Sequence, residues 1–583
     1  MMPVIGFSTT VKYELSFPEP QTHYVEVKMI MEDLNVSVLD LKMPVWAPGS
    51  YLVREFSKHV DSFHGRDRDG QELSSVKLNK NTWRIETNGK KNIVVSYKVY
   101  AFELSVRTSF IDEEHAYLNG TSIFMYNELL LSNPVTVKIN PHSSWKKISV
   151  ALERVKNSDN WQYKAAGYDE LVDAPFEIGN HVTFSFFVAG IPHEVAMFGT
   201  GNYDSLQIKK DFTIIAEECS SVFGEHPCKQ YLFIIHNLNA GGGGLEHANS
   251  TTLQTNRWSY GTSGSYTDFL SLVAHEYFHV WNVKRLRPVP LGPFDYSNEN
   301  YTTMLWIAEG FTAYYDDLII KRCGFISDTD YLKIIAGSMS YCMNIKGAAI
   351  QTLSESSLDA WIKYYRPYEN SGNATVSYYT KGGVVGALLD LEIMKSTNGS
   401  KSLDDVMKEM YQLYYKKLNR PFTEPEFITV VNKVAGKDLS EFFKKYVHDT
   451  IPLPLEKSLA VMGLEIIDLN STQSMAWTGA TTTSTNGKMM VTAVERNSPA
   501  WKYGINVNDE ILAMDKFRVG EDLSKLLSLK RPGETVTFTV SRNGSLKEIQ
   551  LVLEKSSSTK YAIEKSPSQQ EAEKMMYKKW LKM

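Results

Sequence analysis

The stretch Ala274-His275-Glu276-Tyr277-Phe278-His279 contains the pattern of a metal site, around which the rest of this chain is interpreted. Two histidines four positions apart on a helix project from one face, with their Cβ atoms about 5 to 6 Å apart, so both imidazoles can reach one metal ion. A zinc ion with an open coordination position lowers the pKa of its bound water to about 7, and a neighbouring carboxylate can take up the proton. The stretch therefore predicts one zinc ion bound by His275 and His279, with Glu276 as general base. The same ligand types also permit cobalt or manganese.

The sequence around this motif has the pattern of a helix from Ser265 to Arg287. Apolar residues recur at helical spacing, and Pro288 ends the pattern. Lys284 and Arg285 fall near the expected C-terminus of this helix, where basic side chains complement the helix dipole. We therefore interpret these basic residues as solvated surface rather than as a nucleic-acid contact.

A second helical pattern runs from about Tyr301 to Cys323 and contains the candidate third zinc ligand, Glu309. A carboxylate in an apolar stretch of helix is costly to bury unless it binds a metal or joins an ion pair. Asp316 lies about two turns further along the same face, where it can accept the second N–H of a ligating histidine. Simple exposure to solvent is the alternative for Asp316.

Three motifs, in this order along the chain, resemble those of one family of peptidases. They are Trp46-Ala47-Pro48-Gly49-Ser50-Tyr51, Gly243-Gly244-Leu245-Glu246-His247 and His275-Glu276-Tyr277-Phe278-His279-Val280-Trp281-Asn282-Val283-Lys284-Arg285. An HExxH motif followed by a distant Glu-Gly-Phe-Thr is similar to the gluzincin metallopeptidases. Together with a PDZ-like segment, the motifs resemble the glycyl aminopeptidase family over nearly the whole chain. The resemblance implies a zinc aminopeptidase that acts on peptides and prefers glycine or alanine at the amino terminus.

The glycine-rich motif supplies candidate substrate-binding residues. By the resemblance, Gly243 and Gly244 line the cleft and Glu246 holds the α-ammonium group of the substrate. Glycines let the backbone pass close to a ligand, and no Lys-Ser/Thr pair follows that would indicate a phosphate loop. A carboxylate at this position would place the first peptide bond at the metal. The alternative for Glu246 is a turn residue that faces water.

A tyrosine before a Lys-Gly pair is the candidate for stabilising the transition state. Amide hydrolysis builds negative charge on the former carbonyl oxygen, and a phenol aimed at that oxygen stabilises it by a few kcal/mol, typically about 3. In the resembling enzymes this position corresponds to Tyr379, which precedes Lys381-Gly382. Tyr378 is the alternative in register, and a packing role is the alternative for both.

Composition describes a multidomain protein without obvious macromolecular partners other than peptides. The chain has 583 residues, of which 43% are hydrophobic and 22% charged, and a net charge of −5. Neither nucleic-acid binding nor a membrane span is expected, because no basic excess and no long apolar run is present. No secretory signal is visible at the N-terminus, so a cytoplasmic location is expected, with a periplasmic or secreted location as the alternative if a leader has been removed. The four cysteines are interpreted as buried thiols, with a Cys219–Cys228 pair as the alternative.

The expected fold class is multidomain α+β. Short alternating runs separated by turns predict an N-terminal β-sandwich, the metal motifs predict a thermolysin-like catalytic domain, and helical patterns predict a helical domain that completes the cleft. The expected domains are 1–190 (β-sandwich), 191–330 (catalytic), 331–454 (helical), 455–555 (PDZ) and 556–583 (linker and C-terminal helix).

The PDZ-like segment implies a peptide partner. The stretch from Ser498 to Leu512 resembles the core of PDZ domains, which add a peptide strand to a sheet edge and hold its C-terminal carboxylate on backbone N–H groups. Gly463, Leu464, Glu465 and Ile466 are expected to form that carboxylate-binding loop. Glu465 departs from the pattern, because its charge would oppose a carboxylate. The polar run 471–488 is expected to be a mobile loop.

A last helix is expected after Ser566-Pro567, docked on another domain through Ala572, Met576, Trp580 and Met583 on one face.

Two other functions compete with an aminopeptidase. One is an endopeptidase with the same zinc chemistry, in which Glu246 is structural and the PDZ segment delivers protein chains. The other is a scaffold that keeps zinc for stability and acts through its PDZ segment.

Overall fold

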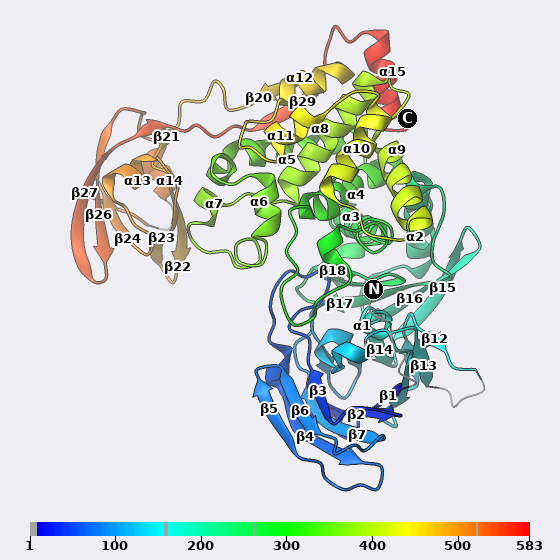
Figure 1. Ribbon diagram of the computed structural model, residues 1–583. Helices are drawn as coiled ribbons and strands as arrows, with labels where there is room; N and C mark the ends of the chain where they lie inside the picture. Colours follow the sequence, from blue (N-terminus) through cyan, green and yellow to red (C-terminus); the bar gives the residue numbers. More distant parts are fainter. Residues whose placement is uncertain (1–8, 157–160, 262, 521–522) are drawn as a thin grey trace. The chain divides into compact units, whose positions relative to one another are not determined.

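The structure, a computed structural model, describes residues 9–156, 161–261, 263–520 and 523–583 (Figure 1). The chain forms two compact units. The first contains Met1–Tyr301, Cys323–Phe325 and Met407–Thr423, and the second contains Thr302–Arg322, Ile326–Val406 and Glu424–Met583. The chain therefore crosses between the units several times.

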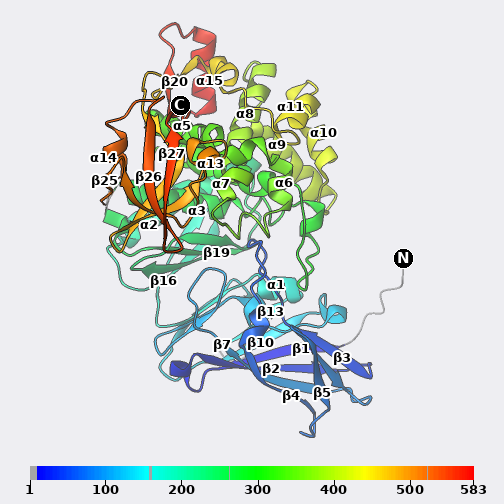
Figure 2. The same cartoon turned by 90° about the vertical axis from the view of Figure 1, so that its left-hand side faces the viewer.

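The N-terminal part of the first unit is built from β-sheets, which confirms the predicted β-rich domain. Its strands are β1 (Thr10–Ser16), β2 (Tyr24–Glu32), β3 (Val38–Lys42), β4 (Val60–Asp67), β5 (Ser75–Asn79), β6 (Thr82–Glu86), β7 (Ile93–Tyr100), β8 (Phe110–Ile111), β9 (Ala116–Leu118), β10 (Val135–Asn140), β11 (Lys147–Ser149), β12 (Glu153–Arg154), β13 (Gln162–Ala165) and β14 (Phe176–Gly179). They form sheets in the orders β12-β13-β10-β1-β2-β7-β4, β11-β14-β9-β8 and β3-β6-β5 (Figure 2). Alternation along β2 buries Val25, Val27 and Met29 in the core of this part.

A second sheet in the first unit carries the glycine-rich motif. Its strands are β15 (Val182–Val188), β16 (Ile191–Phe198), β17 (Tyr231–Leu238), β18 (Gly243–Glu246) and β19 (Ser250–Asn256). The order is β15-β16-β17-β19-β18, so β18 lies at the edge and pairs antiparallel with β19. The helices α2 (Ser205–Phe223) and α3 (Ser263–Phe278) pack on each other, and α3 also packs on β18 and β19. The motif strand and the metal-motif helix are therefore neighbours.

A segment from much later in the chain completes the first unit. It contains η9 (Tyr411–Lys417), whose Tyr411 hydroxyl donates to Glu225 Oε1 at 2.7 Å, while Lys416 pairs with the same carboxylate at 2.8 Å. Pro288 forms a parallel bridge with Phe422. The first unit is thus incomplete without residues 407–423.

Helices dominate the middle of the second unit. They are η7 (Trp306–Gly310), α4 (Phe311–Arg322), α5 (Asp328–Asn344), α6 (Leu353–Leu358), α7 (Ser371–Ala374), α8 (Thr380–Ser396), the first turns of α9 (Leu403–Met410), α10 (Glu424–Ala435), α11 (Ser440–Tyr446) and α12 (Leu455–Leu459). The apolar helix α8 packs against η7, α4 and α5. Helices α8, α4 and α5 are labelled in Figure 1. Helix α8 forms the centre of this helical region.

The PDZ segment is a sheet with its own core. Its elements are β22 (Ala480–Thr485), β23 (Lys488–Val494), α13 (Pro499–Tyr503), β24 (Glu510–Met514), β25 (Phe517–Arg518), α14 (Leu523–Leu527), β26 (Thr535–Arg542) and β27 (Ser545–Val552). The order is β22-β23-β24-β26-β27, and Val491, Val536 and Phe538 are among its buried residues. Part of the run expected to be a mobile loop is therefore the edge strand β22, a threonine-rich segment that pairs antiparallel with β23.

The predicted carboxylate-binding loop lies elsewhere. Residues Leu464–Asp468 form β20, which pairs antiparallel with β29 (Tyr561–Lys565) in a separate two-stranded sheet. Glu465 accepts a hydrogen bond from the Ser566 hydroxyl at 2.5 Å, and a Cβ at Gly463 would meet Gln569. Gly463, Leu464, Glu465 and Ile466 are thus already paired, so placing them at the peptide edge of the PDZ sheet was wrong.

The last helix, α15 (Glu571–Trp580), begins later than predicted, because Gln570 and Glu573 form a capping box. Its buried face consists of Tyr577, Trp580 and the following Leu581. Ala572 and Met583 are exposed, so only part of the predicted stripe is correct. Trp580 Nε1 donates to the Tyr314 hydroxyl on α4 at 2.8 Å.

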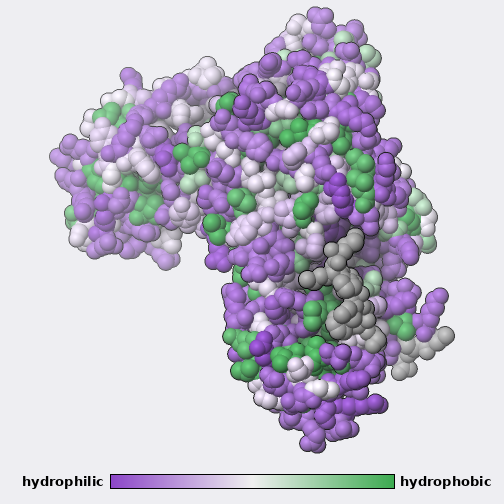
Figure 3. All heavy atoms as spheres, in the orientation of Figure 1, coloured by the Kyte–Doolittle hydropathy of each residue, from purple (hydrophilic) through white to green (hydrophobic). Residues whose placement is uncertain are grey.

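Polar and charged residues cover most of the face drawn in Figure 3, with apolar residues scattered among them. Across the described residues, no helix combines the length and the apolar character that crossing a membrane requires. All four cysteines are free thiols.

Candidate active site

Helix α3 carries the first two predicted ligands to its C-terminal end. It ends at Phe278, so His275 lies in its last turn and His279 directly follows it. The predicted continuation to residue 287 is wrong: Val283 has a positive φ of 90° and its N–H donates to the Leu286 carbonyl, which turns the chain. Lys284 is only 7% exposed, so the interpretation of this residue as solvated surface is also wrong.

The two imidazoles are arranged for a shared ligand. Their ring centroids are 4.8 Å apart and the rings are inclined by 81°. His279 Nδ1 lies 2.9 Å from the Asn282 carbonyl oxygen. A carbonyl can only accept, so Nδ1 carries the proton and Nε2 is the ring nitrogen with the lone pair, as a metal ligand requires. For His279 this carbonyl takes the orienting role that was predicted for Asp316, a half-buried residue of α4.

Two carboxylates accompany the histidines within the first unit. Ligand atoms of Glu246, Glu276 and His279 all lie within 4.8 Å of one another, and all three side chains are buried. Gly244 makes room for Glu276: a Cβ at this position would clash with its carboxylate. The absence of a side chain at Gly244 is therefore a requirement of the site.

Glu246 is a buried carboxylate without a compensating group. It is 4% exposed, and the described residues provide no hydrogen bond or ion pair to it. Burying a charge in this way is costly, so a cationic ligand that pairs with it would be strongly favoured.

The Trp46–Tyr51 motif packs against that carboxylate. Ser50 N–H donates to the Ala47 carbonyl and closes a turn, in which Gly49 has a φ of +87°. A Cβ at Gly49 would lie 2.5 Å from the Glu246 oxygens. A Pro-Gly pair such as Pro48-Gly49 is typical of a turn, but nothing in the sequence indicates that this turn meets Glu246.

Tyr277 fixes the face of α3 that points away from the ligands. Its hydroxyl lies 2.6 Å from His193 Nε2 and 2.5 Å from His226 Nε2. Burial lowers the pKa of both histidines to about 4, so both are neutral near pH 7. The helix that presents His275 and Glu276 is thereby held by a neutral polar network.

The second unit holds the remaining candidates close together. Glu309 is 2% exposed and lies in the π-helical turn η7, a conformation often found at functional sites. A Cβ on the next residue, Gly310, would lie 2.6 Å from the Cα of Gly382. The two glycines let η7 and α8 approach closely, which brings Glu309 near Tyr379, the N-cap residue of α8.

The two candidate tyrosines differ in environment. Tyr378 is fully buried, whereas Tyr379 is half-buried. Burial, and then the charge of Glu309, raises the pKa of Tyr379 well above its usual value. Tyr379 therefore keeps its proton near neutral pH and remains a hydrogen-bond donor.

Comparisons with known proteins agree with this geometry. Family models match for the Peptidase M61 N-terminal domain over residues 12–180, the M61 glycyl aminopeptidase over 268–385 and the PDZ domain over 461–553. No protein among the curated sequences matches the chain.

Two solved structures are similar. An aminopeptidase N family protein from Idiomarina loihiensis is 29% identical, with 98% of this chain and 100% of that chain covered and a TM-score of 0.91. An M1 zinc metallopeptidase from Deinococcus radiodurans is 13% identical, covers 77% of this chain and 96% of its own, and has a TM-score of 0.50, which shows a shared fold alone.

The chain is a zinc metallopeptidase. The matched peptidase region of this metallopeptidase contains His275, His279, Glu309 and Tyr379. The residues fit a zinc ion: the rings of the two histidines lie close enough for a shared ligand, His279 carries its proton on Nδ1, and Gly244 gives the Glu276 carboxylate its place beside them.

Proposed function

We propose that this metallopeptidase is an aminopeptidase that removes glycine or alanine from the free amino termini of peptides. The observation that carries the proposal is the position of Glu246. Its buried, uncompensated carboxylate lies within 4.8 Å of ligand atoms of Glu276 and His279, so a substrate ammonium bound there would lie beside the reacting groups. An enzyme with its cation site next to the catalytic residues cleaves the first peptide bond and not internal ones.

The turn at Gly49 supports a preference for small residues. Its backbone packs directly against the Glu246 carboxylate, which leaves little room beside the α-carbon of a bound amino terminus. The matched model of a glycyl aminopeptidase agrees with this preference.

Each proposed catalytic role follows from the chemistry of its residue. His275, His279 and Glu309 would hold the zinc ion, which when bound polarises the substrate carbonyl and acidifies a water molecule. Glu276 would take the proton from that water and pass it to the departing amine. Tyr379 would donate its O–H to the oxygen that becomes negative in the transition state. Glu246 would hold the amino terminus throughout.

The PDZ sheet would bind a C-terminal peptide at β22. This strand pairs only with β23 among the described residues, and the turn before it contains Gly479, with a φ of 78°, against Ser498. Backbone N–H groups of such a turn could receive the peptide carboxylate, in place of the segment 463–466.

The direct test compares two substrates that differ in one group: alanyl anilide with a free amine and its N-acetylated form. Only the free-amine substrate should be hydrolysed, and Glu276→Gln should remove activity while the protein retains its zinc. Efficient cleavage of the acetylated substrate would instead identify an endopeptidase. A zinc-replete protein inactive on both, and on longer free-amine peptides, would favour the scaffold function.

A further inference from the structure

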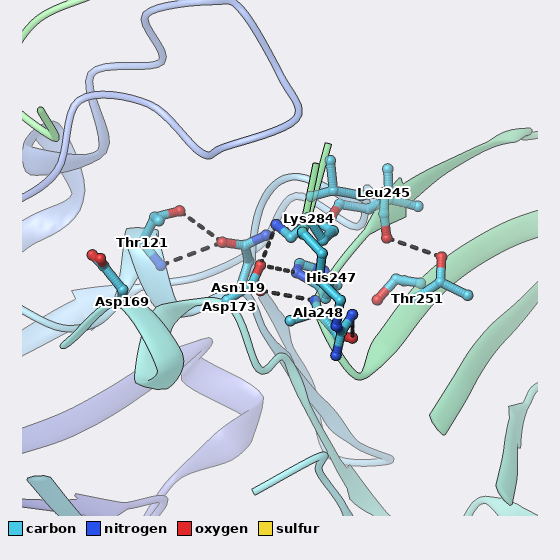
Figure 4. Close-up of polar contacts among 12 residues, drawn as sticks. Asn119, Thr121, Asp169, Asp173, Leu245, His247, Ala248, Thr251 and Lys284 are labelled. Carbon is cyan, nitrogen blue, oxygen red and sulfur yellow. Dashed lines mark hydrogen bonds and ion pairs between the residues drawn. The ribbon is translucent and has the colours of Figure 1, made fainter. Parts of the chain in front are cut away.

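Two of the motifs contain polar residues to which the proposed mechanism gives no role: His247, directly after Glu246, and Lys284, in the turn after His279. Both side chains reach the same carboxylate, that of Asp173, at the end of α1 (Tyr168–Val172) in the N-terminal part of the first unit. Asp173 Oδ1 accepts from Lys284 Nζ at 2.7 Å and from His247 Nδ1 at 3.0 Å. Its Oδ2 accepts from the Ala248 backbone N–H at 2.8 Å. Figure 4 shows the three bonds converging.

Each partner of Asp173 is bonded to a segment with a proposed catalytic residue. His247 and Ala248 directly continue β18, which ends at Glu246. The Lys284 backbone N–H donates to the His279 carbonyl at 3.2 Å. Arg285 joins the same two segments, because its Nη1 donates to the Ala248 carbonyl at 2.9 Å and to the Val280 carbonyl at 2.8 Å.

We propose that Asp173 is a positioning residue that fixes the amine-binding carboxylate of Glu246 relative to the metal ligand His279. This inference rests on the proposed function of Glu246. Asp173 would act through its bonds to His247, Ala248 and Lys284, without touching the substrate.

Packing alone would not fix these side chains. A cavity of about 290 Å³ lies against them and is lined by Leu245, His247 and Lys284 among others. His247 Nε2 is buried and has no hydrogen-bond partner in the described part of the chain, so the imidazole is held on its Nδ1 side only. Its tautomer follows from that bond: Nδ1 carries the proton, because a carboxylate can only accept.

Electrostatics make the Asp173 bonds strong. Burial alone would raise the pKa of Asp173, but the Lys284 ammonium and the His247 N–H outweigh it and hold that pKa well below its usual range. The carboxylate is therefore ionised at any pH at which the enzyme would work, and all its bonds are charge-assisted.

Two variants at position 247 distinguish the effect of losing the hydrogen bond to Asp173 from the effect of changing the size of the side chain. The amide nitrogen of asparagine can occupy the position of Nδ1, so His247→Asn should retain the bond and His247→Leu should lose it. We expect His247→Leu to raise the KM for alanyl anilide by about 10-fold or more, with a smaller change in kcat and unchanged zinc content, because the amine anchor moves while the metal ligands stay. His247→Asn should remain within about 3-fold of the wild type. Asp169→Asn is the matched control, because Asp169 lines the same cavity but bonds to Tyr296.

A second substitution covers the case in which a leucine at position 247 prevents folding. Lys284→Met removes the bond on the metal-ligand side, and its effect on kcat/KM should not add to that of His247→Leu, since both act through Asp173. A wild-type KM in His247→Leu, equal damage in His247→Asn, or fully additive effects would each overturn the inference. If the proposed aminopeptidase function is wrong, the result is different: the wild-type enzyme itself does not cleave a free-amine substrate. In that case both the proposed function and the role of Asp173 are rejected.

Discussion

At the scale of single residues, glycines shape this site as much as its charged groups do. Gly244 lies where a side chain would occupy the place of the Glu276 carboxylate, and Gly49 lies where a side chain would meet Glu246. Neither requirement can be predicted from the sequence, because the sequence does not show whether a glycine next to a motif faces solvent or a carboxylate. The predicted residues themselves, His275, His279 and Glu276, do lie together at the end of one helix.

Gly244→Ala should lower kcat by about 100-fold, because the new methyl group displaces the general base. Gly242→Ala is the matched control on the same glycine run: a Cβ there meets nothing within 4 Å, and its activity should stay within 2-fold, roughly, of the wild type. Steady-state kinetics with zinc content measured in parallel would decide. Equal activity of the two variants would show that Glu276 does not depend on this space.

Tyr379→Phe should lower kcat by about 100-fold or more with little change in KM, as expected for a donor that acts in the transition state. Tyr378→Phe should behave nearly as the wild type, because the Tyr378 ring is fully buried. If the two effects were exchanged, the donor would be the neighbouring tyrosine.

At the scale of elements, the helix patterns were predicted well and their ends less well. The apolar spacing from Thr329 to Asn344 predicts a helix, and it corresponds to α5 (Asp328–Asn344), whose start is capped by Ser327. The metal-motif helix ends at Phe278 instead of residue 287, because hydrogen bonds of the Lys284 and Arg285 side chains hold a turn there. The periodicity of apolar residues predicts a helix, but it does not show that Lys284 bonds to Asp173, a carboxylate far away in the sequence, and that the helix ends before it.

Helix α15 should stabilise α4, the helix that directly follows Glu309. Trp580→Ala removes a 2% exposed indole that donates to Tyr314, and it should lower the free energy of unfolding of the second unit by about 3 to 5 kcal/mol. Met575→Ala, on the exposed side of the same helix, should change it by less than about 0.5 kcal/mol. Denaturant unfolding of the full chain would test this, and a small effect of Trp580→Ala would mean that α15 contributes little to α4.

At the scale of the whole molecule, stability should fall in mild acid. His193 is fully buried and its pKa is lowered to about 4, whereas an unfolded histidine titrates near 6.5. The unfolded state therefore binds protons first, so stability is lost as the pH falls from about 6.5 toward 4 and is unaffected above that window. The loss from His193 should reach on the order of 2 kcal/mol at pH 5.

Metal-free protein should be used for this measurement, because protons also compete for metal ligands. His193→Gln should show a smaller loss of unfolding midpoint between pH 7 and pH 5 than the wild type. His64→Gln, at an exposed histidine, should show the same loss as the wild type. An identical pH dependence of all three proteins would rule out His193 as the source.

The order of domains along the chain could be anticipated, but their interleaving could not. Alternating runs predicted the N-terminal sheets, and the Ser498–Leu512 stretch predicted the PDZ core. Nothing local in Tyr411 or Phe422 indicates that they pack with Glu225 and Pro288 of the first unit. The same limit applies to Gly463–Ile466, which were expected to form a carboxylate-binding loop. Leu464–Asp468 instead form strand β20, whose partner β29 lies about a hundred residues away in the sequence.

That interleaving has a consequence for biosynthesis. A ribosome that has just finished residue 301 has delivered most of the first unit but still lacks the segment 407–423. At about 5 to 20 residues per second, the missing segment follows on the order of ten seconds later. Throughout that interval the nascent chain presents an unfinished apolar face near Phe223 and Trp281, which Tyr411 will later cover. We therefore expect the emerging chain to expose a surface that chaperones on the ribosome can bind until residue 423 has been made.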